Sequence, residues 1–122
     1  MPAPCFLLDE HMPHAIVKGL HRLEPSISIF VMGKSNSPAI GTSDPDLLKW
    51  IEEHKCLLVT NNRATMPGHL REHLASGHHI PGVLIISSRI ALRVILNNLY
   101  LIWGAGFGDE FKDQIVYLPL KH

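Results

Sequence analysis

The sequence lacks several features that would place it in a specialised class of protein. It has only two cysteines in 122 residues, Cys5 and Cys56, and no C-x-x-C spacing. A disulfide framework or a zinc knuckle is therefore not supported, and we predict free buried thiols at both positions. The chain also has no excess of charge of one sign, with eleven lysines and arginines against eleven aspartates and glutamates. This balance argues against a protein that coats nucleic acid or an anionic membrane by bulk charge.

Long hydrophobic runs are also missing. The most apolar stretch, residues 90–103, is interrupted by Arg93, Asn97 and Asn98 and falls short of the ~20 residues that span a bilayer. We predict a buried helix there and no membrane segment. The N-terminal segment has no basic region before its short apolar run, so we expect no signal peptide and a cytoplasmic protein.

Apolar strand-length runs alternate along the chain with amphipathic segments. A length of 122 residues with 46% hydrophobic residues predicts one domain over residues 1–122. Strands are expected at residues 5–8, 26–32, 56–60, 83–87 and 115–118. Helices are expected over 13–24, 44–55, 67–76 and 89–103, followed by a loop at 104–108. The pattern predicts an α/β fold, a three-layer α/β/α sandwich with a central, mostly parallel five-stranded sheet.

Acidic residues stand where a site is expected in such a fold, because sites form beyond the carboxyl ends of parallel strands. Asp9 and Glu10 follow the first strand directly, and Asp44 and Asp46 stand at a helix start. Clustered carboxylates favour Mg²⁺ or Mn²⁺. Two of these acids also have a structural explanation, because Asp44 or Ser43 can cap the helix and Asp46 suits its first turn. Asp9 has no such capping role.

Four segments carry a resemblance to a known family. They are the run FLLDEHMP with Asp9, the run GTSDPDLL with Asp44 and Asp46, the run LLVTNNR with Asn62, and the run PGVLII. In this order they resemble the PIN-like domain, the metal-dependent ribonuclease fold of many bacterial toxins, and more narrowly a short PIN-like subgroup. The resemblance extends over nearly the whole chain.

The resemblance implies roles for individual residues. It makes Asp9 the central metal ligand and Asp44 the second acid, with Asp46 as its competitor, around Mg²⁺ or Mn²⁺. The subgroup often has an aspartate where this chain has Asn62. An asparagine carbonyl can still bind a hard cation or orient a water, but one negative charge is lost. We therefore expect a single weakly held ion, with slower chemistry or none.

Contacts with RNA are expected next to the same strand end. Residues 61–93 contain four arginines against one glutamate, which favours a phosphate-binding surface but also fits a solvated helix face. Arg63 follows the strand exit and is the arginine that we expect to meet a phosphate. Thr60 and Asn61 are expected beside the substrate.

These residues and the resemblance together predict a metal-dependent ribonuclease, the toxin of a toxin–antitoxin pair, with RNA as substrate and an antitoxin protein as partner. The alternative is a catalytically inactive module of the same fold that binds RNA or a protein through the same cleft. A homodimer is expected from the resemblance and from the apolar residues 99–103 at the end of the long helix.

A competing motif lies in the third helix. His69, Glu72 and His73 match the H-x-x-E-H pattern of a class of zinc peptidases. A catalytic zinc needs a third protein ligand and a substrate cleft, and those peptidases are far larger than this chain. We therefore interpret the motif as a polar helix face.

Overall fold

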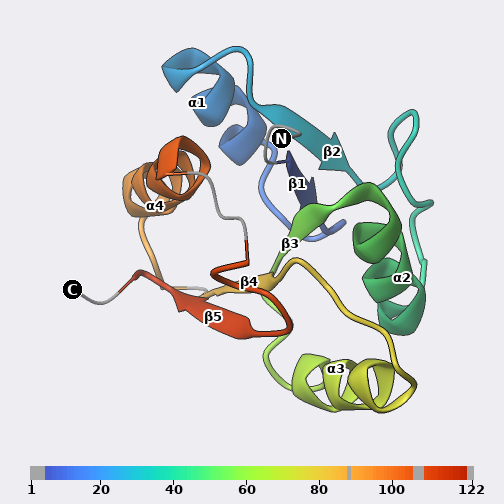
Figure 1. Cartoon of the computed structure of the whole chain (residues 1–122). Coiled ribbons are helices and arrows are strands. Elements are labelled where there is room, and N and C mark those ends of the chain that lie inside the picture. Colours follow the sequence, from blue (N-terminus) through green and yellow to red (C-terminus); the bar gives the residue numbers. More distant parts are fainter. Residues whose placement is uncertain (1–4, 88, 106–108, 121–122) are drawn as a thin grey trace.

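The short apolar runs of the sequence form a five-stranded sheet, and the segments between them form four helices (Figure 1). This computed structural model describes residues 5–87, 89–105 and 109–120. The strands are β1 (Cys5–Leu8), β2 (Ser28–Val31), β3 (Cys56–Thr60), β4 (Val83–Ile86) and β5 (Ile115–Leu118). The helices are α1 (Ala15–Leu23), α2 (Asp44–His54), α3 (Met66–Ala75) and α4 (Leu92–Ala105). The predicted α/β class is confirmed.

The order of strands in the sheet is β2-β1-β3-β4-β5, and every neighbouring pair is parallel. The sheet is therefore entirely parallel, where the sequence predicted a mostly parallel one. From β1 the chain moves outward to β2 and then returns to place β3 on the other side of β1. This reversal of direction between β1 and β3 is the point at which open parallel sheets form their ligand sites.

Both faces of the sheet carry a hydrophobic cluster, because successive strand residues point to opposite sides. In β1, Phe6 and Leu8 join one cluster, and Leu7 joins the other. The first cluster includes residues of α1 and α4, namely Ile16, Leu20, Ile95, Leu99 and Ile102. The second includes residues of α2 and α3, namely Leu47, Leu48, Ile51, Met66 and Leu70. Figure 1 accordingly shows α1 and α4 on one side of the sheet and α2 and α3 on the other.

Local signals fix both ends of α2. Ser43 is the N-cap, and its hydroxyl accepts a hydrogen bond of 3.4 Å from the backbone N–H of Asp46. Pro45 suits the first turn, where no intrahelical N–H partner is needed. At the other end, Lys55 adopts a left-handed conformation with a φ of 57°. This residue ends the helix and lets β3 begin immediately at Cys56.

The last helix differs from its predicted bounds. It runs from Leu92 to Ala105 and contains Gly104, so the prediction of a loop from residue 104 is wrong at its start. A glycine costs a helix about 1 kcal/mol relative to alanine, which packing of the other residues offsets. Residues 106–108 of the predicted loop lie outside the described residues. Across the described ranges, no helix has the length and apolar character needed to cross a membrane.

The apolar residues near the end of α4 divide between core and surface. Leu99 and Ile102 are buried, whereas Tyr100 and Leu101 are exposed. The core thus accounts for part of the segment from which a dimer contact was predicted. Tyr100 and Leu101 remain exposed and available for a dimer contact, which stays a prediction.

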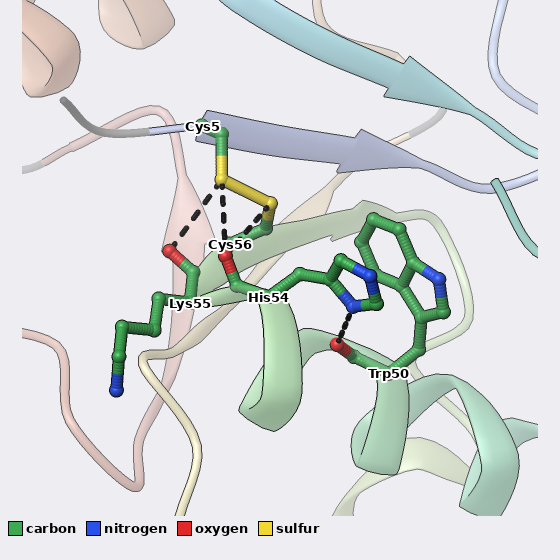
Figure 2. Close-up of a disulfide and its surroundings, with 5 residues drawn as sticks. All are labelled: Cys5, Trp50, His54, Lys55 and Cys56. Carbon is green, nitrogen blue, oxygen red and sulfur yellow. Dashed lines mark hydrogen bonds between the residues drawn. A yellow bond between two sulfur atoms is a disulfide. The ribbon is translucent and has the colours of Figure 1, made fainter. Parts of the chain in front are cut away.

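The prediction of free thiols is wrong, because Cys5 and Cys56 form a disulfide (Figure 2). The strands β1 and β3 are parallel neighbours, and their register pairs these two residues directly. Their Cα atoms are 4.7 Å apart, within the range that a disulfide bridges. Figure 2 also shows the sulfur atoms beside the backbone carbonyl oxygens of His54 and Lys55.

Candidate functional site

A cleft of about 420 Å³ lies at the carboxyl ends of β1 and β3, next to the N-terminus of α2. Its lining residues are Asp9, Glu10, His11, Met32, Thr42, Asp44, Leu47, Asn61 and Asn62. Four of the residues predicted for the site, counting both acids and amides, are therefore brought to one cleft. The position agrees with the switch point of the strand order.

Asp9 is the most constrained acid of the cleft, with a relative exposure of 7%. Its Oδ1 accepts a hydrogen bond of 2.8 Å from the backbone N–H of His11. Its Oδ2 accepts a short hydrogen bond from the hydroxyl of Thr60, which is itself buried. Two donors from different segments thus hold the carboxylate in one orientation at the end of β1.

Asp44 is free to face the cleft because Ser43 takes the capping role. Its Oδ2 accepts a hydrogen bond of 2.7 Å from the side-chain nitrogen of Asn62. The Nε2 of His69 lies 3.8 Å from the same oxygen. Asp46, the competing acid, is exposed and is not among the cleft residues. The structure therefore places Asp44, and not Asp46, in the site.

Asn62 connects the two ends of the cleft. Its side-chain nitrogen donates to Asp44 and also, at 2.8 Å, to the hydroxyl of Thr65. Its side-chain oxygen accepts a hydrogen bond of 3.3 Å from the backbone N–H of Thr65. The backbone N–H of Asn62 donates to the hydroxyl of Thr60 at 3.1 Å. A continuous network thus runs from Asp9 through Thr60 and Asn62 to Asp44, and Thr60 lies beneath the cleft as a link within it.

Glu10 is a third carboxylate of the cleft, predicted as a member of the acidic cluster but not as an individual metal ligand. Its Oε1 accepts a hydrogen bond of 3.1 Å from the backbone N–H of Gly41. Gly41 has a φ of 88°, a conformation that glycine adopts at little cost. The bond ties the loop before α2 to the end of β1. The position of Glu10 directly after Asp9 was the available signal for this role.

The residues predicted to contact RNA are divided. Asn61 is exposed and lines the cleft. Arg63 is exposed but does not line it, and its guanidinium carbon lies 5.9 Å from the ring centroid of Tyr117 on β5. This is the distance of a cation–π contact. The structure thus places Arg63 toward the β5 side of the sheet, and its contact with a phosphate stays a prediction.

The donors of the cleft suit a hard cation. Asp9, Glu10 and Asp44 offer carboxylate oxygens and Asn61 offers a side-chain carbonyl, which is the oxygen-only set that Mg²⁺ and Mn²⁺ prefer. Asp44 also stands at the positive end of the α2 dipole, so part of its charge is already compensated. Among the described residues, the three carboxylates of the cleft are not a group whose ligand atoms already converge, so an ion held by them belongs to the proposed function.

A second group of potential metal ligands lies outside the cleft. Within the ranges that the structure describes, Glu52, His73 and His78 each offer a ligand atom, and these atoms lie within 4.8 Å of one another. A possible metal-binding cluster therefore exists, with no identity of the metal. The H-x-x-E-H motif does not form one centre, because His73 contacts Glu52 whereas His69 lies beside Asp44.

Opposing effects act on the Glu52 carboxyl. Burial by itself raises its pKa. Hydrogen bonds from the backbone of His79 and from the ring of His73, together with the charges of His78 and His73, lower the pKa and prevail, so that it lies below its ordinary value. The group is therefore held as a carboxylate.

No family model matches the chain, and neither a curated protein nor a solved structure matches it. The resemblance to the PIN-like domain rests on the four quoted segments.

Proposed function

We propose that the chain is a three-layer PIN-like domain that hydrolyses RNA phosphodiester bonds with the help of Mg²⁺ or Mn²⁺. The observation that carries the proposal is the pair Asp9 and Asp44, two carboxylates from different elements that line one cleft at the switch point of the sheet. Neither has a capping role, since Ser43 caps α2.

Asp9, Asp44 and Glu10 are the residues that would hold the ion. A bound divalent ion supplies an acidified water and neutralises charge on the leaving oxygen. Thr60 and the backbone of His11 fix the Asp9 carboxylate and leave it little freedom to reorient. This fixed orientation reduces the reorganisation that binding requires.

Two further side chains act around the cleft. His69 lies with its Nε2 beside the Asp44 carboxylate, and a histidine in this position can hold a proton close to the reacting phosphate. Asn61 reaches the cleft surface and can donate to a phosphate oxygen. Arg63 lies outside the cleft lining and near Tyr117 of β5, so it would extend the phosphate-contacting surface in that direction.

The proposed setting follows the toxins that the motifs resemble. An antitoxin protein would then bind the chain and cover the cleft, and the chain would work in the cytoplasm as a homodimer. An adjacent small gene that encodes a DNA-binding protein would support this setting.

A binding module without catalysis is the second candidate, and Asn62 favours it. Its side-chain nitrogen already donates a hydrogen bond to the Asp44 carboxylate. Its side-chain oxygen accepts one from the backbone N–H of Thr65. The arrangement therefore needs no cation to hold this part of the cleft together. RNA or a protein partner would then bind through Asn61 and the exposed arginines.

The experiment is cleavage of a labelled single-stranded RNA by the purified chain in EDTA, Mg²⁺ or Mn²⁺. The wild type is compared with Asp9→Asn, Asp44→Asn and Asp46→Asn, each checked for folding by circular dichroism. Asp46→Asn is the matched control, because it removes the same charge from the same helix turn outside the cleft.

We expect metal-dependent cleavage that falls by about 100-fold or more in Asp9→Asn and Asp44→Asn, and by less than about threefold in Asp46→Asn. Equal cleavage by all four proteins would identify a contaminating nuclease and overturn the proposal. RNA binding without cleavage by the wild type would favour the binding module.

A further inference from the structure

The helices α2 and α3 carry different chemistry at their two ends. Asp44 and His69 stand near the cleft, whereas Glu52 lies eight residues after Asp44, about 12 Å further along α2. His73 lies one turn after His69 on α3, and His78 follows that helix. We propose that Glu52, His73 and His78 form a binding site for one Zn²⁺ ion. The proposal does not rest on the function of the cleft.

The three side chains already converge on one point. The Nε2 of His73 and the Nδ1 of His78 lie 2.9 Å and 3.3 Å from the same oxygen, Oε1 of Glu52. Bonds of about 2.0–2.2 Å at tetrahedral angles place zinc ligands roughly 3.4 Å apart. The two separations from Glu52 are close to this value, and all three atoms lie within 4.8 Å of one another, so small side-chain movements are enough to admit an ion between them.

The chain fold prepares this convergence. His73 is buried, and the backbone N–H of His78 donates to its carbonyl oxygen at 3.2 Å. Gly77 makes the turn between them with a φ of 87°, a conformation that favours glycine. The rings of His73 and His78 are consequently stacked, with their centroids 4.8 Å apart. The buried His73 therefore has little rotamer freedom for an ion to remove.

Neighbouring residues support the ligands. The second oxygen of Glu52 accepts a hydrogen bond of 3.4 Å from the backbone N–H of His79. Asp113 in turn binds the ring of His79 at 2.7 Å and the backbone N–H of Ile80 at 2.8 Å. Partners of this kind fix ligand orientation in metal sites.

The type of donor selects the metal. Two imidazole nitrogens and one carboxylate form a set that zinc accepts, with a water in the fourth position, whereas Mg²⁺ prefers oxygen ligands alone. The ion would join α2, α3 and the segment that leads into β4. Its expected effect is therefore stabilisation of this end of the two helices.

The test uses the full chain without a histidine tag, treated with EDTA and then desalted. Zn²⁺ is titrated against a chromophoric chelator in excess Mg²⁺, and Co²⁺ is added separately to record its visible spectrum. The wild type is compared with Glu52→Gln, His78→Gln and His69→Gln. His78 lies outside the core, with a side-chain exposure of 47%, so its replacement leaves the core intact.

We expect one Zn²⁺ per chain, an affinity at least about tenfold weaker in Glu52→Gln and His78→Gln, and a change below about twofold in His69→Gln. Co²⁺ bound to the wild type should give the intense visible absorption of a four-coordinate site. The same absorption should be much weaker in His78→Gln. Equal Zn²⁺ affinity in the wild type and His78→Gln would overturn the proposal. A loss in His69→Gln instead would assign binding to the helical pair His69 and His73 and would also overturn it.

Discussion

The side-chain nitrogen of Asn62 donates a hydrogen bond of 2.7 Å to Oδ2 of Asp44. An aspartate at position 62 would bring two carboxylates to this distance, and like charges so close need a proton or a cation between them. The amide of Asn62 supplies the attraction that a cation would otherwise supply. The cleft is therefore held together in a state that does not require a metal ion.

Replacing Asn62 by aspartate should make the stability of the chain depend on a divalent ion. In EDTA we expect the free energy of unfolding to fall by about 1–3 kcal/mol, because a hydrogen bond is replaced by repulsion. Added Mg²⁺ should restore most of this loss. Thermal denaturation in EDTA and in Mg²⁺ measures both effects. Asn97→Asp adds the same charge at an exposed position of α4 outside the cleft lining, and a response of equal size in that variant would contradict the explanation.

Reduction of the bond between Cys5 and Cys56 should destabilise the chain. The two residues are 51 positions apart, and closing a loop of this size contributes about 4 kcal/mol in the chain-entropy model. Urea denaturation with and without dithiothreitol measures the difference. The double variant Cys5→Ala with Cys56→Ala should not respond to the reductant, and an unchanged wild type would show that the thiols are free. Disulfides are rare in the reducing cytoplasm. The bond therefore favours an oxidising compartment, whereas the predicted location is a reducing one.

Acid should weaken the contact of Asp113 with the segment before β4. Burial by itself raises the pKa of this carboxyl, but hydrogen bonds from the backbone of Ile80 and the ring of His79 lower it below its ordinary value of 3.8. A depressed pKa means that the contribution to stability is complete above the unfolded value and is lost as the pH falls through the folded one. The affected range therefore lies below about pH 4.

The variant Asp113→Asn tests this dependence. Position 113 has a φ of 60°, which asparagine tolerates well. At neutral pH we expect the variant to be less stable by about 1 kcal/mol, and the difference from the wild type should shrink as the pH falls toward about 3. Urea denaturation at the two pH values checks this, and a constant difference would exclude the carboxylate as its cause.

Local patterns explain how much of the fold was predictable. The apolar run at Cys56–Thr60 and the cap-and-proline start of α2 have physical causes within a few residues, and the structure confirms both. The extent of α4 was not predictable in the same way. Gly104 is a weak helix former, and the helix continues through it although the residue is exposed and a Cβ at this position would contact no other element.

The candidate site shows the same division. The position of Asp9 at the end of an apolar strand was visible in the sequence, because sites of parallel sheets form at carboxyl ends. The choice between Asp44 and Asp46 was not visible, since it depends on Ser43 acting as the cap and on Asn62 reaching Asp44 from the loop after β3. Glu52, His73 and His78 come from two helices and the segment after α3, so no single sequence motif predicts this group.

The sequence by itself determined the alternation of strands and helices and the acidic strand end, because hydrophobic periodicity and helix signals act over short distances. Only the tertiary structure decided which strands are neighbours. That choice joined Cys5 to Cys56 and brought Asn62 to Asp44. The tertiary structure also gave two histidines of one helix different partners, Asp44 for His69 and Glu52 for His73. The physical reason is that pairing and register bring together residues dozens of positions apart, and no local pattern specifies those distances.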